Sequence, residues 1–240
     1  MFLVDHQANK ELANAVGRPP ERLPIKITAH IVHGNALQLD WADILPASAS
    51  KTYIFGNPPF RGDAREEEQQ ADLERAWAGK TTKISRLDFV TGWHAKCLDF
   101  FNSREGRFAF VTTNSITQGD QVPRLFGPIF EAGWRIRFAH RTFAWDSEAP
   151  GKAAVHCVIV GFDRSHSPRP RLWEYPTVKA EPRQVPVERG INAYLVDGPN
   201  VLVEKASKPL SLIIEKTSYG SKPTDGGNPV SYTHLTLPTS

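Results

Sequence analysis

Apolar residues in this chain recur with two periods, one typical of strands and one typical of helices. Residues 52–56 (Thr-Tyr-Ile-Phe-Gly) form a β-rich run that ends at Asn57-Pro58, because proline supplies no donor to a strand ladder. Residues 85–101 place apolar side chains at helical spacing, which predicts a helix with one buried face. These side chains are Leu87, Val90, Trp93, Cys97, Leu98 and Phe101.

The same criteria predict the remaining elements. We expect helices at residues 5–16 and 123–132, and strands at residues 30–33, 108–112, 134–140 and 153–162. The polar stretch 61–83 predicts a solvated helix or a mobile loop.

The last two predicted strands are separated only by residues 141–152. This connection is too short for a crossover helix, so we expect the two strands to pair antiparallel. Strands that alternate with helices and end in such a pair predict an α/β fold with a mostly parallel sheet.

The chain changes character after Arg164, where prolines become frequent among short β-like pieces. We therefore expect a first domain at residues 1–164 and the start of a second, β-rich module at residues 165–228. Residues 229–240 resemble a translated adapter sequence, so we interpret them as a non-native tail and exclude them from fold reasoning.

Composition excludes few functions. The net charge of +3 over 240 residues permits a polyanionic partner without requiring one. Cys97 and Cys157 lie in apolar segments, which predicts buried, reduced thiols. His30 and His33 do not form a metal-ligand pattern, so we expect no metal site. No apolar stretch approaches the roughly 20 residues needed to cross a bilayer, and we expect no membrane association and a cytoplasmic location.

The string Asn57-Pro58-Pro59-Phe60 is the feature that points to chemistry. An amine conjugated with a purine ring is a poor nucleophile, and two acceptors can draw it toward tetrahedral geometry. The Asn57 side-chain oxygen and the Pro58 carbonyl can be those acceptors, and Phe60 can stack on an extruded base. A proline turn that merely caps a strand is the alternative interpretation.

This string resembles motif IV of the amino-methyltransferases. Its surroundings resemble the MmeI-like branch of adenine-specific DNA methyltransferases, in which restriction and modification share one polypeptide. The similarity runs from about residue 2 to about residue 227 and includes several further segments. These are residues 5–9, 33–37, 40–41, 113–116, 118–119, 139–145, 151–157 and 191–195.

The resemblance implies a Rossmann-like class I methyltransferase sheet, S-adenosylmethionine as cofactor and double-stranded DNA as partner. Asn57 and Pro58, with Pro59, would hold the adenine amine, and Phe60 would stack on the flipped base.

The resemblance also implies roles for residues outside motif IV. Asn35, at the end of a strand, and Asp40 would contact the adenine moiety of the cofactor, with a merely polar strand terminus or turn as the alternative for Asn35. Leu87-Asp88-Phe89, opening a helix, would line its pocket, although core packing explains Leu87 and Phe89 equally well.

A further group would contact the DNA. Phe143 or Trp145 would pack on the target base, with core burial as the alternative. Lys152 and Arg141, together with Arg135, Arg137 and Arg164, would contact phosphates, with a solvated face as the alternative.

The sequence departs from the family at the cofactor site. The Gly-rich loop and the acidic residue that hold the methionine and ribose parts of the cofactor do not occur. We therefore expect a fragment that depends on the remainder of a longer polypeptide, folds poorly alone and binds cofactor weakly. The nuclease domain of the family is also absent, so we expect no cleavage activity.

Two alternatives stay open. An amine methyltransferase acting on RNA or protein shares motif IV. An inactive fragment would act at most as a DNA-binding module through its Pro-rich portion.

Overall fold

The computed structural model describes residues 2–17, 29–47, 51–61, 65–145, 155–165 and 168–204. The chain divides into two compact units, residues 1–46 and residues 47–240, and each is described by itself.

The first unit contains two helices, α1 (Phe2–Val16) and α2 (Trp41–Ile44). The first confirms the helix predicted at residues 5–16. The strand predicted at residues 30–33 is wrong, because this run has no strand assignment and Ile31 is 86% exposed. A strand needs a ladder partner for its backbone groups, and the described residues offer none to this run. Asn35 therefore lies in a turn, and not at the end of a strand.

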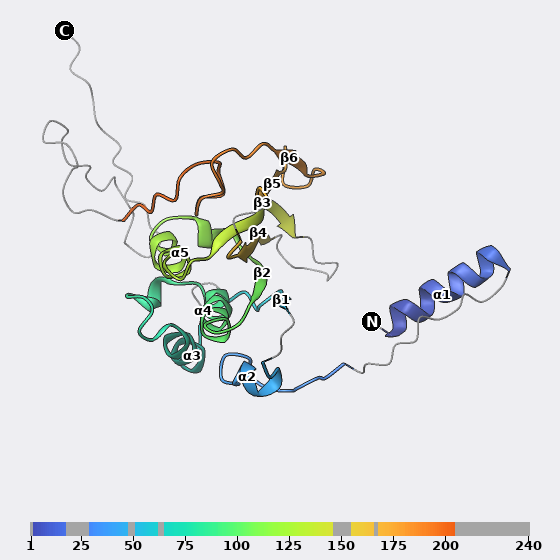
Figure 1. The fold of residues 1–240 in the computed structure, drawn as a ribbon, viewed down its shortest axis with the longest axis horizontal. Helices are drawn as coiled ribbons and strands as arrows, with labels where there is room; N and C mark the ends of the chain where they lie inside the picture. Colours follow the sequence, from blue (N-terminus) through green and yellow to red (C-terminus); the bar gives the residue numbers. More distant parts are fainter. Residues whose placement is uncertain are drawn as a thin grey trace, which may run out of the picture. The chain divides into compact units, whose positions relative to one another are not determined.

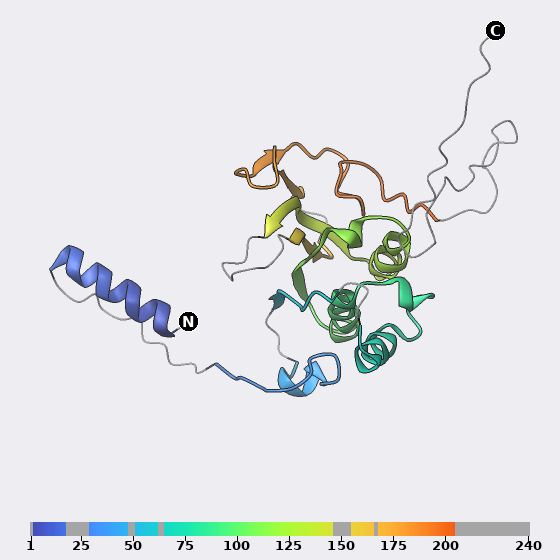
Figure 2. The ribbon, with the colours of Figure 1, turned by 180° about the vertical axis from the view of Figure 1, so that it is seen from behind.

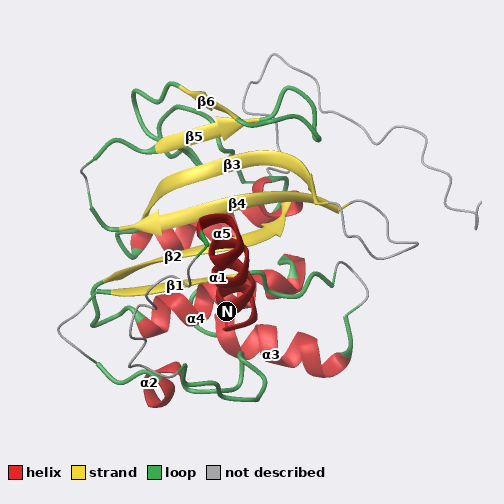
Figure 3. Cartoon of the chain, turned by 90° about the vertical axis from the view of Figure 1, so that its right-hand side faces the viewer, coloured by secondary structure: helices red, strands yellow, loops and turns green. Residues whose placement is uncertain are grey.

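The second unit is built on a six-stranded sheet with the order β1-β2-β4-β3-β5-β6 (Figure 3). Its strands are β1 (Thr52–Gly56), β2 (Gly106–Thr113), β3 (Arg135–Trp145), β4 (Val155–Asp163), β5 (Arg171–Glu174) and β6 (Arg183–Val185). The pairs β1·β2 and β3·β5 are parallel, whereas β4 is antiparallel to both of its neighbours. Strands β1, β2, β3 and β5 therefore run in one direction, and the antiparallel pairing of β3 with β4 is confirmed.

Helices cover one face of this sheet (Figures 1 and 2). They are α3 (Glu67–Trp77), α4 (Gly92–Phe100) and α5 (Gln121–Glu131). On that face Phe108 and Phe110 of β2 and Phe162 of β4 are almost fully buried. Phe126 of α5 packs against Phe162 with ring centroids 6.2 Å apart, so the core is an aromatic layer between the sheet and the helices.

Helix α3 forms in the polar stretch for which a solvated helix or a loop was predicted. Glu66 and Gln69 make a capping box at its start, and Glu67 and Glu68 suit the positive end of the helix dipole. Its other face is buried through Leu73 and Trp77. The stretch is therefore an amphipathic helix of the domain core.

The helix predicted at residues 85–101 begins later than expected. Two 3-10 turns, η1 (Ile84–Arg86) and η2 (Phe89–Thr91), precede α4, which starts at Gly92. Asp88 is extended, and its carbonyl accepts from the Thr91 backbone and hydroxyl at 3.0 and 2.7 Å. These local bonds favour a tight turn over an α-helix at Leu87-Asp88-Phe89, which therefore does not open the helix.

The sheet continues past residue 164, where the proline content indicates a boundary. Strand β5 pairs with β3 through Ala139↔Leu172, and β6 pairs with β5. Residues 171–185 thus extend the same sheet.

Cys97 and Cys157 are buried and make no disulfide, as predicted for structural thiols. Burial raises the pKa of the Cys157 thiol to about 11. None of the helices in the described ranges combines the length and the apolar character needed to span a bilayer.

Candidate active site

The carboxyl ends of the four codirectional strands meet at one edge of the sheet, which we call the carboxyl edge. In open α/β sheets ligands bind at this edge. Asn57-Pro58-Pro59-Phe60 follows β1, and the 3-10 turn η3 (Asn114–Thr117) follows β2. Phe143 and Trp145 lie at the end of β3.

The Asn57 loop leaves β1 from a defined position, because Gly56 pairs with Phe110 of β2. Asn57 is exposed, Pro58 is buried and Phe60 is half-buried. A buried proline with its fixed φ anchors the loop, while the amide next to it faces solvent. This arrangement leaves the Asn57 oxygen accessible to a substrate amine.

Asp88 lies at the same edge, beside the end of β2. It is only 8% exposed, and its Oδ2 accepts hydrogen bonds from Thr113 at 2.7 Å and Ser115 at 3.2 Å. Its backbone amide donates to Gln121 Oε1 at 2.7 Å. Its other oxygen, Oδ1, is buried and has no hydrogen-bond partner among the described residues. A buried unpaired acceptor is costly, and it is a group that a bound donor would satisfy.

The two neighbours of Asp88 are core residues. Leu87 is 1% exposed and Phe89 is 5% exposed. The Phe89 ring packs edge-on against Trp93 at 5.6 Å. Both side chains therefore support the Asp88 backbone from the helix side.

Asn35 and Asp40 use their side chains for local capping. Asn35 Oδ1 accepts from the Leu37 amide at 3.0 Å, and Asp40 Oδ1 accepts from the Ala42 amide at 2.7 Å as N-cap of α2. Both belong to the first unit, so their cofactor role stays a prediction.

An aromatic group marks the end of β3. The rings of Phe143 and Trp145 lie 6.3 Å apart, and Phe143 lies 5.3 Å from Tyr175. Trp145 is 41% exposed, whereas Phe143 is half-buried. Both therefore share one aromatic surface that reaches from β3 to the end of β5.

The Arg141 side chain makes two hydrogen bonds to other parts of the protein. Its Nε donates to the Leu195 carbonyl at 2.8 Å, and Nη1 donates to Glu174 Oε2 at 2.7 Å. These contacts fix the guanidinium between β3 and β5. Lys152 lies outside the described residues.

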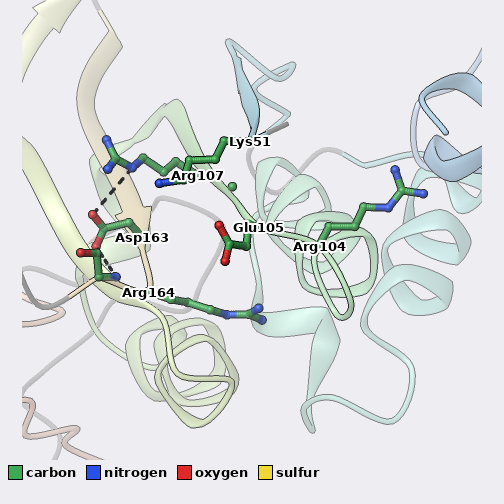
Figure 4. A pocket seen from close by; sticks show the side chains of 8 residues that line it. Lys51, Arg104, Glu105, Arg107, Asp163 and Arg164 are labelled. Carbon is green, nitrogen blue, oxygen red and sulfur yellow. Dashed lines mark hydrogen bonds and ion pairs between the residues drawn. The ribbon is translucent and has the colours of Figure 1, made fainter. Parts of the chain in front are cut away.

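The opposite edge of the sheet holds a cluster of arginines around one carboxylate. Asp163 is 1% exposed and has guanidinium groups of Arg107, Arg135 and Arg137 within 4.0 Å. Figure 4 shows the ion pair between Arg107 and Asp163. Arg164 stacks on Trp134 at 4.4 Å and donates to the Phe101 carbonyl. Burial is the largest influence on the pKa of Arg137 and lowers it, whereas the nearby Asp163 carboxylate raises it. Three of the arginines predicted as phosphate contacts, Arg135, Arg137 and Arg164, thus make internal contacts at this edge.

Sequence reasoning did not foresee the partners of Asp88. In the sequence, Thr113 and Ser115 stand out only as part of a segment that resembles the family. Hydroxyl residues at the end of an apolar strand indicate a polar site there, but they do not indicate that the partner is Asp88, 25 residues upstream of Thr113.

Comparison with known proteins places these features in a family. The family model of the MmeI DNA-methyltransferase domain matches residues 1–174. The chain belongs to this MmeI methyltransferase family. Asn57, Asp88 and Phe143 all lie within the matched residues.

Two relatives extend the match beyond residue 174. DNA methyltransferase A of Bacillus subtilis (strain 168) is 34% identical over 231 residues, which are 95% of this chain and 25% of that protein. The solved structure of the Type IIL restriction-modification enzyme MmeI in complex with DNA is 42% identical with a TM-score of 0.79. It matches 94% of this chain and 30% of the MmeI chain. The chain thus spans between a quarter and a third of the length of these relatives.

Proposed function

We propose that the protein containing this chain methylates DNA at the exocyclic amine of adenine, with S-adenosylmethionine as methyl donor. The observation that carries this proposal is the Asn57-Pro58 pair at the carboxyl edge, with the asparagine exposed and the proline anchored. Membership of the MmeI methyltransferase family supports DNA as the substrate.

The chemistry of the pair favours an aromatic amine. The Asn57 oxygen and the Pro58 carbonyl are two acceptors for the two hydrogens of such an amine. Holding both hydrogens directs the nitrogen lone pair away from the ring, toward a methyl donor. Because the buried Pro58 anchors the loop, its carbonyl is positioned before the substrate arrives and can stabilise the transition state without reorganisation.

An adenine in a duplex reaches this edge only after it is flipped out of the stack. Phe60 after β1 and the Phe143–Trp145 surface at the end of β3 are the aromatic faces that we propose for the extruded base.

The residues at this edge fit the methyl donor in one respect. S-Adenosylmethionine presents an ammonium group, ribose hydroxyls and an adenine amine as donors, and Asp88 Oδ1 is a buried acceptor without a partner among the described residues. When bound, the cofactor supplies an electrophilic methyl group. Asp88 would hold a donor of the cofactor, and Leu87 and Phe89 would keep water away from that contact.

We keep as a proposal the division into residues 1–164, part of the catalytic domain, and residues 165–228, the entry to a target-recognition module. Strands β5 and β6 of the second range continue the sheet of the first. The remainder of the polypeptide would complete the cofactor site and the recognition of double-stranded DNA.

The test is Asn57→Ala in the full-length protein. Loss of one preorganised acceptor reduces methyl transfer by about 10²- to 10³-fold and leaves DNA binding intact. Tritiated methyl transfer to DNA, RNA and protein measures the activity, and nucleoside mass spectrometry identifies the modified base. Asn102→Ala, at an exposed position after α4, is the matched control.

Near-normal turnover by Asn57→Ala would remove the proposed role of the motif. Methylation of RNA, protein or cytosine in place of adenine would show that the proposed substrate, adenine in DNA, is wrong.

A further inference from the structure

A cavity lies at the carboxyl edge, next to the aromatic surface of Phe143 and Trp145. Its volume is about 440 Å³, and it lies among η3, β3, the end of β5 and the turn at residues 194–195. Its chemically informative lining residues are Gln118, Arg141, Glu174, Tyr175, Tyr194 and Leu195. We call it the flanking cavity.

The charged groups of the flanking cavity are held rigidly. Glu174 accepts from Arg141 through Oε2 and from Arg183 through Oε1, at 2.7 and 2.9 Å. The hydrogen bond from Arg183 lowers the pKa of Glu174. The carboxylate is therefore ionised at neutral pH. Oε1 already binds Nε and Nη2 of Arg183, at 2.9 and 2.7 Å, whereas Oε2 has only Arg141 as a donor among the described residues and keeps a second lone pair that can accept another.

Leu195 in the wall is held in a conformation that leucine rarely adopts, with φ of 55°. Two groups keep it there. Asn192 Oδ1 accepts from the Tyr194 and Val196 amides, and Arg141 donates to the Leu195 carbonyl. Strained backbone that the surroundings enforce occurs preferentially at ligand sites.

The flanking cavity adjoins the surface that we assign to the target base. Tyr175 lines the cavity, and its ring lies 5.3 Å from Phe143. Its hydroxyl shares a hydrogen bond of 2.8 Å with His140, whose ring stacks on Trp173 at 4.7 Å. The Tyr175 side chain is thus held in place between the flanking cavity and the surface of Phe143 and Trp145.

We propose that the flanking cavity binds a nucleobase of the DNA next to the flipped adenine. This inference rests on the proposed function, because it assumes that DNA lies along the carboxyl edge. The free lone pair of Glu174 Oε2 suits a base edge with an exocyclic amine, which donates hydrogen bonds as a phosphate does not. Tyr175 and Tyr194 offer faces for stacking, and the amide of Gln118 can pair with a base edge in either direction. The cavity therefore selects the base beside the target.

The experiment uses the full-length protein after its methylated sequence has been mapped in genomic DNA. Thr142→Trp fills the cavity from β3, and Gln118→Ala removes one exposed lining amide without touching the Arg141–Glu174 pair. Gln70→Ala is the matched control, because it lines a different cavity of about 400 Å³ on α3.

The first readout is a cross-link on bound DNA. Duplexes carry 5-iodouracil at one flanking position at a time, and mass spectrometry locates the cross-linked residue after irradiation. We expect one flanking position to cross-link to Tyr175 or Tyr194, and Thr142→Trp to abolish that cross-link.

The second readout is kcat/KM for duplexes that vary the base at that position. We expect the wild type to discriminate by about 5- to 150-fold, as for a well-formed base contact, and both cavity variants to lose the discrimination. Gln70→Ala should keep it. Absence of any cross-link to these tyrosines, or unchanged discrimination in Thr142→Trp, would overturn the proposal.

Failure of the proposed function has a different signature. In that case the wild type transfers no methyl group to adenine, while the cross-link on bound DNA still decides whether a base occupies the flanking cavity.

Discussion

Two buried aspartates at opposite edges of the same sheet have opposite surroundings. Asp163, at the end of β4, has three arginines within 4.0 Å. Asp88, at the carboxyl edge, is bound by two hydroxyls. Each carboxylate leaves one oxygen without a hydrogen-bond partner in the described part of the chain, but that of Asp163 has guanidinium nitrogens at 3.4 and 3.9 Å, whereas Asp88 forms no ion pair with a described residue. The first carboxylate is paired with cations of its own protein, and the second is the one for which we propose a donor of the cofactor. The comparison thus assigns stability to one edge and the proposed function to the other.

The difference gives the arginines a role that composition does not reveal. Arg135 and Arg137 also donate to the Pro168 carbonyl, so Asp163 and the loop after β4 share the same cations. These side chains join β3, β4 and the connection to β5. We therefore expect their loss to reduce stability before it affects DNA binding.

The largest effect should follow Asp163→Ala. Removing one partner from a buried ionic cluster costs about 3 to 5 kcal/mol, since the remaining charges lose their counterion. Hydrogen exchange at β3 and β4 should accelerate accordingly. Asp99→Ala, which breaks an ion pair with Lys80 at a side chain that is 58% exposed, should cost less than 1 kcal/mol on the scale of about 0 to 1 for surface pairs.

Equal costs for Asp163→Ala and Asp99→Ala would show that the arginine cluster is a surface feature. A loss of DNA binding by Asp163→Ala without loss of stability would restore the arginines as phosphate contacts.

A buried histidine tests, through pH, how much a buried charge without a counterion destabilises the fold. His94 of α4 packs among Phe108, Phe110 and Phe162, and burial lowers its pKa from 6.5 to about 4. Because the folded pKa is below the unfolded value, its contribution to stability is complete above pH 6.5 and decreases as the pH falls toward 4. The loss amounts to about 3 kcal/mol.

His94→Phe should flatten the pH dependence of hydrogen exchange in β2 and α4 between pH 6.5 and 4. His30→Ala, at an exposed ring, should leave it unchanged. An identical acid response in wild type and His94→Phe would show that other groups control it.

The sequence predicts an element correctly where neighbouring residues along the chain determine its bounds or its pairing. Strand β1 has the predicted bounds because Asn57-Pro58 ends the ladder, and the β3–β4 pairing follows from the shortness of their connection. The Asn57 loop could be placed at the carboxyl edge for the same reason.

Features that depend on distant partners could not be predicted. Arg135 lies opposite Asp163 only because of the antiparallel register of β3 and β4. Residues 30–33 have the composition of a strand, but a strand forms only where a neighbour completes its hydrogen bonds. The Asp88 turn depends on Thr91 and Gln121, which the helical spacing of apolar residues does not reveal.

A smaller effect should separate Asp88 from Asp163. Asp88→Asn keeps the shape and the hydroxyl contacts but removes the charge, so the fold should persist. A hydrogen bond to a charged group contributes about 1.5 to 3 kcal/mol, which corresponds to about 10- to 150-fold weaker cofactor binding. Calorimetric titration of the full-length protein with S-adenosylmethionine measures this, with Asp99→Asn as control. A loss of stability with unchanged affinity would make Asp88 a structural residue like Asp163.

The smallest effect concerns Phe60, the half-buried last residue of the Asn57-Pro58-Pro59-Phe60 string. Flipping an adenine costs a few kcal/mol, and stacking on an aromatic ring recovers about 1 to 3 kcal/mol of it. Phe60→Ala should therefore reduce kcat/KM more for a paired adenine than for an adenine opposite a mismatch, which is already easier to extrude. Phe60→Trp retains an aromatic face and should be tolerated better. Fluorescence of 2-aminopurine at the target position reports unstacking in each variant. Equal losses on matched and mismatched duplexes would mean that Phe60 shapes the loop and does not hold the flipped base.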